Sequence, residues 1–130
     1  MNAGLTIRVC REPGCAIVTV AGEIDIATVA RLRQRLNALA DSGRPVIADL
    51  DQVGFMDASG LGAIVGASRR ATAHGSSFQV VCDRRQTRRL FRLAGLERQI
   101  RLAEPWSRPS RLWRATGQLN EMLVINGLLE

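Results

Sequence analysis

The sequence predicts one α/β domain with a mixed β-sheet of about five strands and three or four helices. Its 130 residues, 46% of them apolar, are typical of a single domain with a real core. An alternating segment, a Pro-Gly turn and an apolar segment predict an antiparallel hairpin at the start. Short apolar segments then alternate with segments of helical period, which predicts βαβ units with right-handed crossovers.

The predicted hairpin occupies residues 5–10 and 16–21. In the first segment, apolar residues alternate with other residues at period two, as in a strand with one buried face. Pro13 and Gly14 suit the central positions of a type II turn. The second segment is apolar on both faces, which indicates a strand near the centre of the sheet that is covered on two sides.

A first crossover helix follows, with Asp25 placed to cap it and Gly43 placed to end it. Its apolar positions recur at helical spacing: Val29, Leu32, Leu36 and Leu39. Residues 46–50 form a short apolar segment that follows this helix in the chain, so we expect a strand parallel to residues 16–21.

The next helix opens near residues 57–59, buries Leu61, Ile64, Val65, Ser68 and Ala71, and stops at His74-Gly75. A strand over 78–82, an Arg-rich helix over 84–94 with Leu90, Phe91 and Ala94 inward, and a strand over 100–102 complete the pattern. We therefore expect a domain over residues 1–103. Residues 104–130 form a C-terminal extension that is partly flexible or contains a short docked helix.

Several classes of protein are excluded by composition. No apolar run approaches the roughly 20 residues that span a bilayer, and the N-terminus lacks the pattern of a signal peptide. We therefore expect a cytoplasmic protein that does not enter a membrane. Three cysteines without a C-x-x-C pair indicate buried, reduced thiols rather than disulfides or a zinc site.

The net charge of +6 is concentrated in residues 84–114, where ten Arg face two acidic residues. Trp106 and Trp113 lie among these arginines, an arrangement compatible with nucleic-acid binding. No motif for reading bases accompanies the charge, so a solvated helix face is the favoured interpretation and no nucleic-acid partner is expected. A gel shift at physiological salt separates the two interpretations.

Residues 49–62 differ from an ordinary connection between strand and helix, because they hold three carboxylates, one Ser and three Gly. Gly60 and Gly62 each cost a helix up to about 1 kcal/mol relative to Ala, which indicates that another body approaches the backbone. The unpaired amides of a first helical turn, together with the helix dipole, favour a phosphate or carboxylate there. Ser59 lies at this point.

Simpler roles compete with a functional one. On the pattern alone, Ser59 or Asp57 serving as an N-cap is favoured. A catalytic serine does not fit, because Asp57 stands where a nucleophile elbow needs Gly and His74 lies at the far end of the helix. Asp25 and Asp57 could share one edge of the sheet, but capping explains each, and we expect no metal or other cofactor.

Three segments resemble the STAS domains of bacterial anti-sigma factor antagonists, over about residues 4–103. They are GEIDIAT at 22–28, VGFMDASGLG at 53–62 and RRLFRLAGL at 88–96, of which the second is the most specific. The resemblance implies the STAS fold. It also implies a regulator rather than an enzyme.

The resemblance further implies that an anti-sigma factor, itself an ATP-dependent serine/threonine kinase, phosphorylates Ser59, and that a serine phosphatase reverses the modification. The unphosphorylated protein sequesters the kinase and so frees a sigma factor. The implied partner-binding residues are Asp25, Asp57, Ala58, Gly60, Leu61 and Gly62. Ala58 departs from the family, which usually has a second Ser there.

Phosphorylation adds about −1.5 to −2 charges at Ser59. We expect the chain itself to tolerate this charge at the positive end of a helix, while a docked partner is repelled next to Asp25 and Asp57. A STAS module that serves as a scaffold or sensor, without regular phosphorylation, is the alternative.

Overall fold

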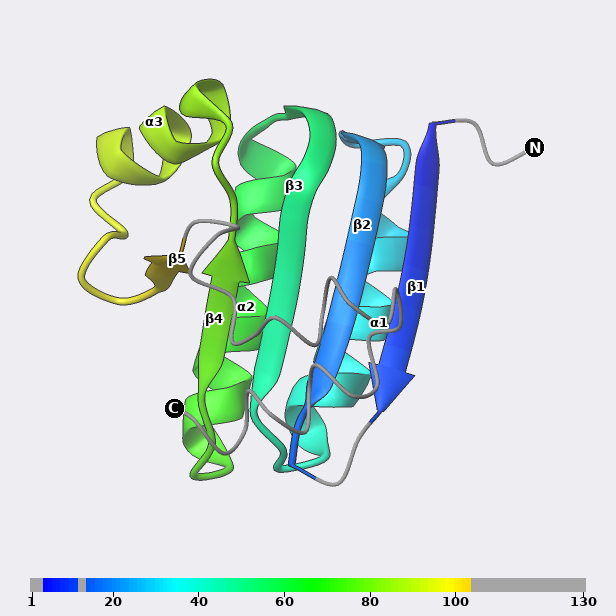
Figure 1. Cartoon of the computed structure of the whole chain (residues 1–130), viewed down its shortest axis with the longest axis vertical. Helices are drawn as coiled ribbons and strands as arrows, with labels where there is room; N and C mark the ends of the chain where they lie inside the picture. The colour runs from blue at the N-terminus through cyan, green and yellow to red at the C-terminus, as the bar shows by residue number, and fades with distance from the viewer. Residues whose placement is uncertain (1–3, 12–13, 104–130) are drawn as a thin grey trace, which may run out of the picture.

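The computed structural model describes residues 4–11 and 14–103, which form a three-helix, five-strand α/β fold (Figure 1). The elements are β1 (Leu5–Arg11), β2 (Ala16–Ile24), α1 (Val29–Asp41), β3 (Val46–Met56), α2 (Ala58–Ala73), β4 (Phe78–Val81), α3 (Arg85–Leu93) and β5 (Arg101–Ala103). The predicted fold class is confirmed. Residues 12–13, which hold part of the predicted turn, and the extension over 104–130 lie outside the described residues.

The sheet has the order β1-β2-β3-β4-β5, so each strand pairs with its neighbour in the sequence. β1 is antiparallel to β2, and all other pairs are parallel. This pairing confirms the predicted hairpin followed by βαβ units. β3 is the central strand, and β2 lies beside it.

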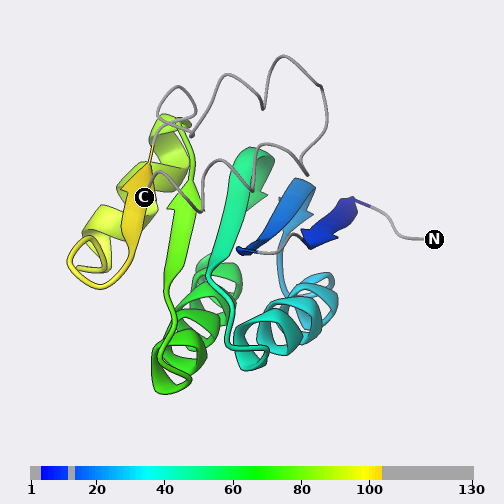
Figure 2. The same ribbon diagram turned by 60° about the horizontal axis from the view of Figure 1, so that its bottom comes forward.

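One face of the sheet carries the main core. Helices α1 and α2 lie together against this face, and α3 lies at the end of the sheet near β4 and β5 (Figures 1 and 2). Leu32 and Leu36 of α1, Ile64 of α2 and Phe91 of α3 are all 0% exposed in one cluster with the strands. The helical spacing of these residues explains why each helix buries a single face.

The opposite face of the sheet holds a second, smaller cluster of buried residues. Each of its members belongs to a strand or lies next to one. Its members are Cys15, Ile17, Ile47, Val81 and Ala103.

The structure corrects several predicted boundaries. β2 and β3 continue to Ile24 and Met56, although the sequence pattern ended them at residues 21 and 50. Register shifts after Thr19 and after Gly22 interrupt the period-two alternation, which is why the pattern lost both strands. α1 begins at Val29 with Thr28 as N-cap, so Asp25 does not cap it directly.

Smaller differences concern two side chains at helix surfaces. Ala94, predicted to face inward, is exposed, because α3 ends at Leu93 and the chain turns away at this C-cap. Val65 is partly buried and packs against the main core cluster. In the described part of the chain, no helix is long and apolar enough to cross a membrane.

Candidate functional site

The candidate site lies where β2 and β3 end and α2 begins. Ile24 and Met56 are register partners in the last positions of these parallel strands, and the Asp57 amide donates to the Ile24 carbonyl over 3.2 Å. Asp25 and Asp57 therefore follow neighbouring strands at the same edge of the sheet. Parallel sheets present their functional groups at this carboxyl-terminal edge.

Asp57 is the N-cap of α2 and binds Ser59 closely. Its Oδ1 accepts hydrogen bonds from the Ser59 amide at 2.9 Å and from the Gly60 amide at 3.3 Å. The Ser59 hydroxyl donates to the same oxygen at 2.5 Å. The backbone amides at the start of α2 were expected to be free to bind an anion. They instead donate to the carboxylate of Asp57, which occupies the positive end of the helix.

This arrangement also sets the charge of Asp57. The hydrogen bond from the Ser59 hydroxyl, helped by the Gly60 and Ser59 amides, lowers the pKa of Asp57 below 3.8 against an opposing effect of desolvation. Asp57 is therefore ionised at neutral pH. The Ser59 side chain, which is partly buried, has its hydroxyl directed at a negative charge.

Asp25 shapes the loop between β2 and α1. Its Oδ1 accepts from the Ala27 amide at 2.9 Å and the Thr28 amide at 3.2 Å, and its own amide donates to Thr28 Oγ1 at 3.0 Å. These bonds form a local turn of the kind that Asp favours before helices. One consequence is that Ile26, at the tip of the turn, is 78% exposed.

The two glycines of the first turn of α2 have different surroundings. A Cβ on Gly60 would lie 2.6 Å from Ile24 Cγ2 and 2.7 Å from Met56 Cγ, so the body that approaches Gly60 is the protein's own strand ends. A Cβ on Gly62 would meet nothing within 4 Å. Gly60 therefore does not support the expectation that another molecule approaches the helix backbone. At Gly62 there is room for such a molecule.

The predicted site residues of the first turn of α2 also divide into exposed and buried ones. Ala58 and Gly62 are exposed, whereas Gly60 and Leu61 are buried, Leu61 being 8% exposed within the core. In this chain Gly60 and Leu61 therefore position the start of α2 and present no side chain at the surface.

The sequence pattern missed two apolar side chains beside these residues. Phe55 of β3 is 51% exposed and Ile26 is 78% exposed. Each lies within two residues of a motif aspartate, Phe55 before Asp57 and Ile26 after Asp25, and this position was the available signal. Strand periodicity instead assigns such residues to a core. We call the exposed and partly buried residues of this edge the Ser59 rim: Asp25, Ile26, Phe55, Asp57, Ala58, Ser59 and Gly62.

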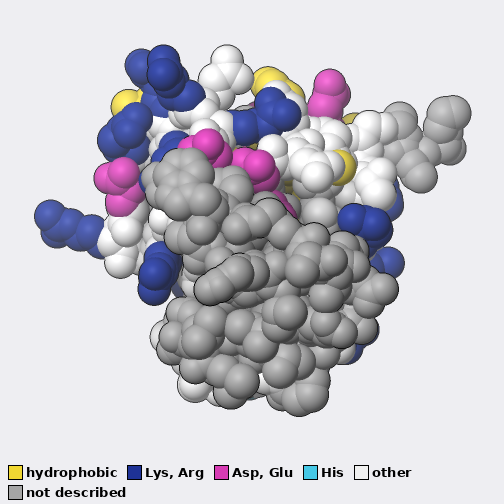
Figure 3. All heavy atoms as spheres, in the orientation of Figure 1, with side chains coloured by type: hydrophobic (Ala, Val, Ile, Leu, Met, Phe, Trp, Pro, Cys, Tyr) yellow, Lys and Arg dark blue, Asp and Glu magenta, His cyan; other side chains and the backbone are white. Residues whose placement is uncertain are grey.

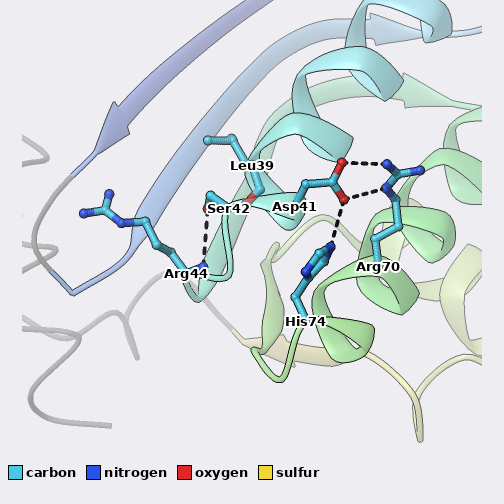
Figure 4. Close-up of polar contacts among 6 residues, drawn as sticks. All are labelled: Leu39, Asp41, Ser42, Arg44, Arg70 and His74. Carbon is cyan, nitrogen blue, oxygen red and sulfur yellow. Dashed lines mark hydrogen bonds and ion pairs between the residues drawn. The ribbon is translucent and has the colours of Figure 1, made fainter.

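His74 lies at the other end of α2, about 22 Å from Ser59 by the rise of the helix. There its Nε2 approaches Asp41 Oδ1 at 3.4 Å, and Arg70 binds the same carboxylate through two nitrogens at 2.9 and 2.6 Å (Figure 4). Arg70 lowers the pKa of Asp41. The cluster links the ends of α1 and α2 and contributes nothing to the Ser59 rim.

Two arginines of the basic segment donate to backbone carbonyls, one within β3 and one just past β4. Arg84 Nε donates to the Asp51 carbonyl at 2.9 Å, and Arg88 Nη1 donates to the Cys82 carbonyl at 2.8 Å. Arg85, Arg89 and Arg92 are exposed on α3. The structure thus gives part of the positive charge a role in holding α3. Over residues 4–11 and 14–103, no group of three or more His, Cys, Asp or Glu is placed to hold a metal.

The STAS domain family model matches residues 6–110 of the sequence. The chain belongs to the STAS domain family. This assignment confirms the resemblance seen in the three sequence motifs. The STAS match covers the described sheet and helices from the second residue of β1 onward.

Two relatives of this chain are both named as anti-sigma factor antagonists. Anti-sigma-F factor antagonist RsfB of Mycobacterium tuberculosis is 32% identical over 99 residues, which cover 75% of this chain and 80% of RsfB. The anti-sigma-B factor antagonist of Bacillus subtilis is 35% identical over 80 residues, covering 62% of this chain and 73% of that protein.

Solved STAS structures agree with the fold. An anti-sigma factor antagonist from Mycobacterium paratuberculosis has a TM-score of 0.71 and 27% identity, covering 87% of this chain and 92% of its own. The unphosphorylated form of the anti-sigma factor antagonist SpoIIAA has a TM-score of 0.66 at 20% identity, covering 88% and 100%, a likeness of fold alone.

Proposed function

We propose that this STAS domain is an anti-sigma factor antagonist whose unphosphorylated form binds an anti-sigma factor serine kinase through the Ser59 rim. Binding sequesters the kinase, and a sigma factor is released in the cytoplasm. The observation that carries the proposal is the Ser59 hydroxyl, held by Asp57 at the start of α2 on the edge where β2 and β3 end. The names of the curated relatives support the same role.

The Ser59 rim has the features of a protein-binding surface. Ile26 and Phe55 expose apolar area within two residues of the carboxylates of Asp25 and Asp57. Apolar anchors with charged neighbours are typical of interfaces. The complementary partner surface is apolar with cationic side chains at its border.

Phosphorylation of Ser59 acts on a contact that the structure defines. The kinase transfers the γ-phosphoryl group of its ATP to Ser59 Oγ: the bond from the γ-phosphorus to its bridging oxygen breaks, ADP leaves, and the hydroxyl proton is released to solvent. The hydrogen bond that this hydroxyl donates to Asp57 is lost. The phosphate adds about −1.5 to −2 charges beside an ionised carboxylate. Because that carboxylate already binds the helix amides, the phosphate must displace it or turn toward solvent.

That the chain tolerates the phosphate remains a prediction, but the free amides on which it rested are already bound by Asp57. In either arrangement, the charge and shape of the Ser59 rim change at the point of contact with the partner. A penalty of about 3 kcal/mol weakens binding more than a hundredfold. ATP and its metal ion belong to the kinase, a serine phosphatase restores the hydroxyl, and this chain is the substrate and regulator.

Phosphorylation is tested by incubating the full chain with a candidate anti-sigma kinase and ATP, followed by mass spectrometry. We expect one phosphate on Ser59 and none on Ser59→Ala. A phosphate on another residue contradicts the assignment of the site. Absence of labelling by every kinase that binds the chain favours the scaffold or sensor alternative.

Binding is tested by calorimetry with the same kinase. Ser59→Asp is expected to lose more than a hundredfold in affinity, by the argument above. Ser77→Asp adds the same charge on an exposed serine that follows α2 in the chain, and it serves as the matched control. We expect Ser77→Asp to leave the affinity for the kinase unchanged. Equal affinity of the chain and Ser59→Asp would refute the switch.

A further inference from the structure

Helix α3 presents a cationic face to solvent. Four exposed residues recur at the spacing of a single helix face, and we call them the α3 face: Arg85, Arg89, Arg92 and Leu93. Phe91, on the opposite side of the helix, is 0% exposed, and the sequence of α3 contains no acidic residue. Leu93 is 71% exposed beside the arginines. The α3 face therefore combines positive charge with a large apolar side chain in water.

The exposed large apolar side chains in the described part of the chain lie on only two surfaces. Ile26 and Phe55 belong to the Ser59 rim, and Leu93 belongs to the α3 face. The charges of the two surfaces are opposite, because the rim holds Asp25 and Asp57 and no arginine. Arginine and apolar residues are enriched at protein interfaces. The α3 face thus has the composition that fits the Ser59 rim, an apolar anchor bordered by cations.

Both surfaces lie at the same end of the molecule. The strands β2, β3 and β4 are parallel, so the Ser59 rim, which follows β2 and β3, and the start of α3, which follows β4, are at one edge of the sheet. Figure 1 shows α3 at this end, and Figure 3 shows arginine side chains gathered over it at the upper left.

Hydrogen bonds fix the start of α3 to the central strand of the sheet. The Asp83 amide donates to Asp51 Oδ1 at 2.8 Å, and Arg84 Nε donates to the Asp51 carbonyl at 2.9 Å. Because Asp51 belongs to β3, the strand that leads into Asp57, these bonds hold α3 in place relative to the rim. The chain therefore presents two surfaces of opposite charge in a fixed arrangement.

We propose that two copies of this chain form a two-fold symmetric dimer, in which the α3 face of each copy lies on the Ser59 rim of the other. In a two-fold contact every pairing occurs twice, so two unlike surfaces at one edge of a chain are both matched. The net charge of +6 makes other surfaces of two copies repel, which favours this contact because opposite charges meet there. Ile26, Phe55 and Leu93 of both copies leave water in the dimer.

The dimer covers Ser59. A second copy and a kinase that binds the Ser59 rim therefore exclude one another, and this consequence rests on the proposed function. The dimer itself does not, because it follows from the charges and exposed side chains of the two surfaces. Dimer formation and kinase binding are accordingly measured separately.

Sedimentation velocity of the full chain tests the association. Three large apolar side chains and a few charge pairs from each copy make a small interface, so we expect a dissociation constant of about 10–100 μM. The observed mass should rise from one chain to two between about 1 and 500 μM. A mass of one chain throughout this range overturns the proposal. Growth beyond two chains also overturns it, because a two-fold contact closes.

A charge reversal with a matched control locates the contact. Arg89→Asp reverses a charge of the α3 face, and Arg35→Asp makes the same change on an exposed residue of α1, so that both variants have the same net charge. We expect Arg89→Asp to raise the dissociation constant of the dimer at least about tenfold, since like charges then face each other, and Arg35→Asp to leave it unchanged. Equal dissociation constants of the two variants overturn the proposal.

Mixing two weakened variants tests the two-fold pairing. Ile26→Arg places a cation on the Ser59 rim, at a side chain that is 78% exposed, and should by itself weaken the dimer as Arg89→Asp does. In an equimolar mixture, the acidified α3 face of Arg89→Asp meets the cationic rim of Ile26→Arg, and the unaltered rim of the first meets the unaltered α3 face of the second. We expect the mixture to dimerise more tightly than either variant alone. A mixture that associates no better than its components overturns the proposal.

Kinase binding by Arg89→Asp distinguishes this proposal from the proposed function. At concentrations where the chain is a monomer, we expect calorimetry to give the same kinase affinity for Arg89→Asp and for the unaltered chain. Loss of kinase binding in Arg89→Asp with dimerisation intact overturns the dimer, because the α3 face then serves the kinase. An intact dimer in a chain that binds no kinase would instead contradict the proposed function alone.

Discussion

Gly60 and Gly62 lie two residues apart on α2, yet alanine should act on them in opposite directions. At Gly60 the added Cβ meets Ile24 and Met56 at 2.6 and 2.7 Å, so these side chains must shift. We expect Gly60→Ala to lower the free energy of unfolding by about 1–3 kcal/mol. At Gly62 nothing lies within 4 Å, and Gly62→Ala should raise it by about 0.5–1 kcal/mol. Urea titration measures both.

A substitution at Gly62 can test binding to the kinase without lowering the stability of the fold. Gly62 is exposed on the Ser59 rim, so a larger side chain there enters the proposed interface without harming the fold. We expect Gly62→Leu to bind the kinase at least tenfold more weakly while unfolding at no lower urea concentration. Unchanged binding would place the interface away from this turn of α2.

Asp57 provides a pH dependence whose sign follows from its environment. The Ser59 hydroxyl lowers its pKa below 3.8 in the folded chain. The ionised carboxylate therefore stabilises the fold above pH 3.8, and this contribution is lost as the pH falls through the lowered folded pKa. We expect Ser59→Ala to move the pKa of Asp57 back toward 3.8.

NMR titration of the Asp57 carboxyl group measures this shift directly. Asp41 is the internal control, because its pKa is lowered by Arg70 at the other end of α2 and should not respond to Ser59→Ala. An unchanged Asp57 pKa in Ser59→Ala would show that the amides alone hold the carboxylate.

At the scale of elements, Arg84 and Arg88 bind α3 to the sheet, and Arg88 is the partly buried one. Arg88 donates to the Cys82 carbonyl at the end of β4, whereas Arg89 next to it is exposed. A charged donor to a buried carbonyl is worth about 1.5–3 kcal/mol, and a surface substitution usually less than about 0.5. Arg88→Gln should therefore destabilise the chain clearly, and Arg89→Gln should not, as measured by urea unfolding. Equal effects would mean that the hydrogen bond of Arg88 to the Cys82 carbonyl does not stabilise α3.

The limits of the sequence are clearest in β3. Residues 46–50 were recognised because they form an apolar run, but the strand continues through Asp51, Gln52 and Gly54. Pairing with β2 fixes these polar residues as a strand, and the register shifts remove the alternation that would have revealed it. Information of this kind lies in the neighbouring strand and is absent from a local window.

For the whole molecule, topology could be predicted because consecutive strands are neighbours and the connections are short helices. The candidate site was located by the composition of residues 49–62. The N-cap role predicted for Asp57 is confirmed. What the pattern did not reveal is that its carboxylate occupies the helix terminus that appeared open for an anion and also binds the Ser59 hydroxyl. Ile26 and Phe55 were missed because exposure of an apolar residue depends on loop shape and on bulges.

The distribution of charge over the whole molecule leads to the last prediction. Arg85, Arg89, Arg92, Arg98 and Arg101 are exposed, and Arg84 and Arg88 bind backbone carbonyls, but no motif for reading bases accompanies these charges. We expect duplex DNA to bind no more tightly than about 1 μM at physiological salt, without sequence preference. Fluorescence anisotropy over a salt series measures this, and Arg89→Gln should reduce the slope of log K against log salt by about 0.9 if Arg89 contacts a phosphate. Binding at about 10 nM with preference for one sequence would instead identify a nucleic-acid-binding protein, because only base contacts give such a ratio over non-specific binding.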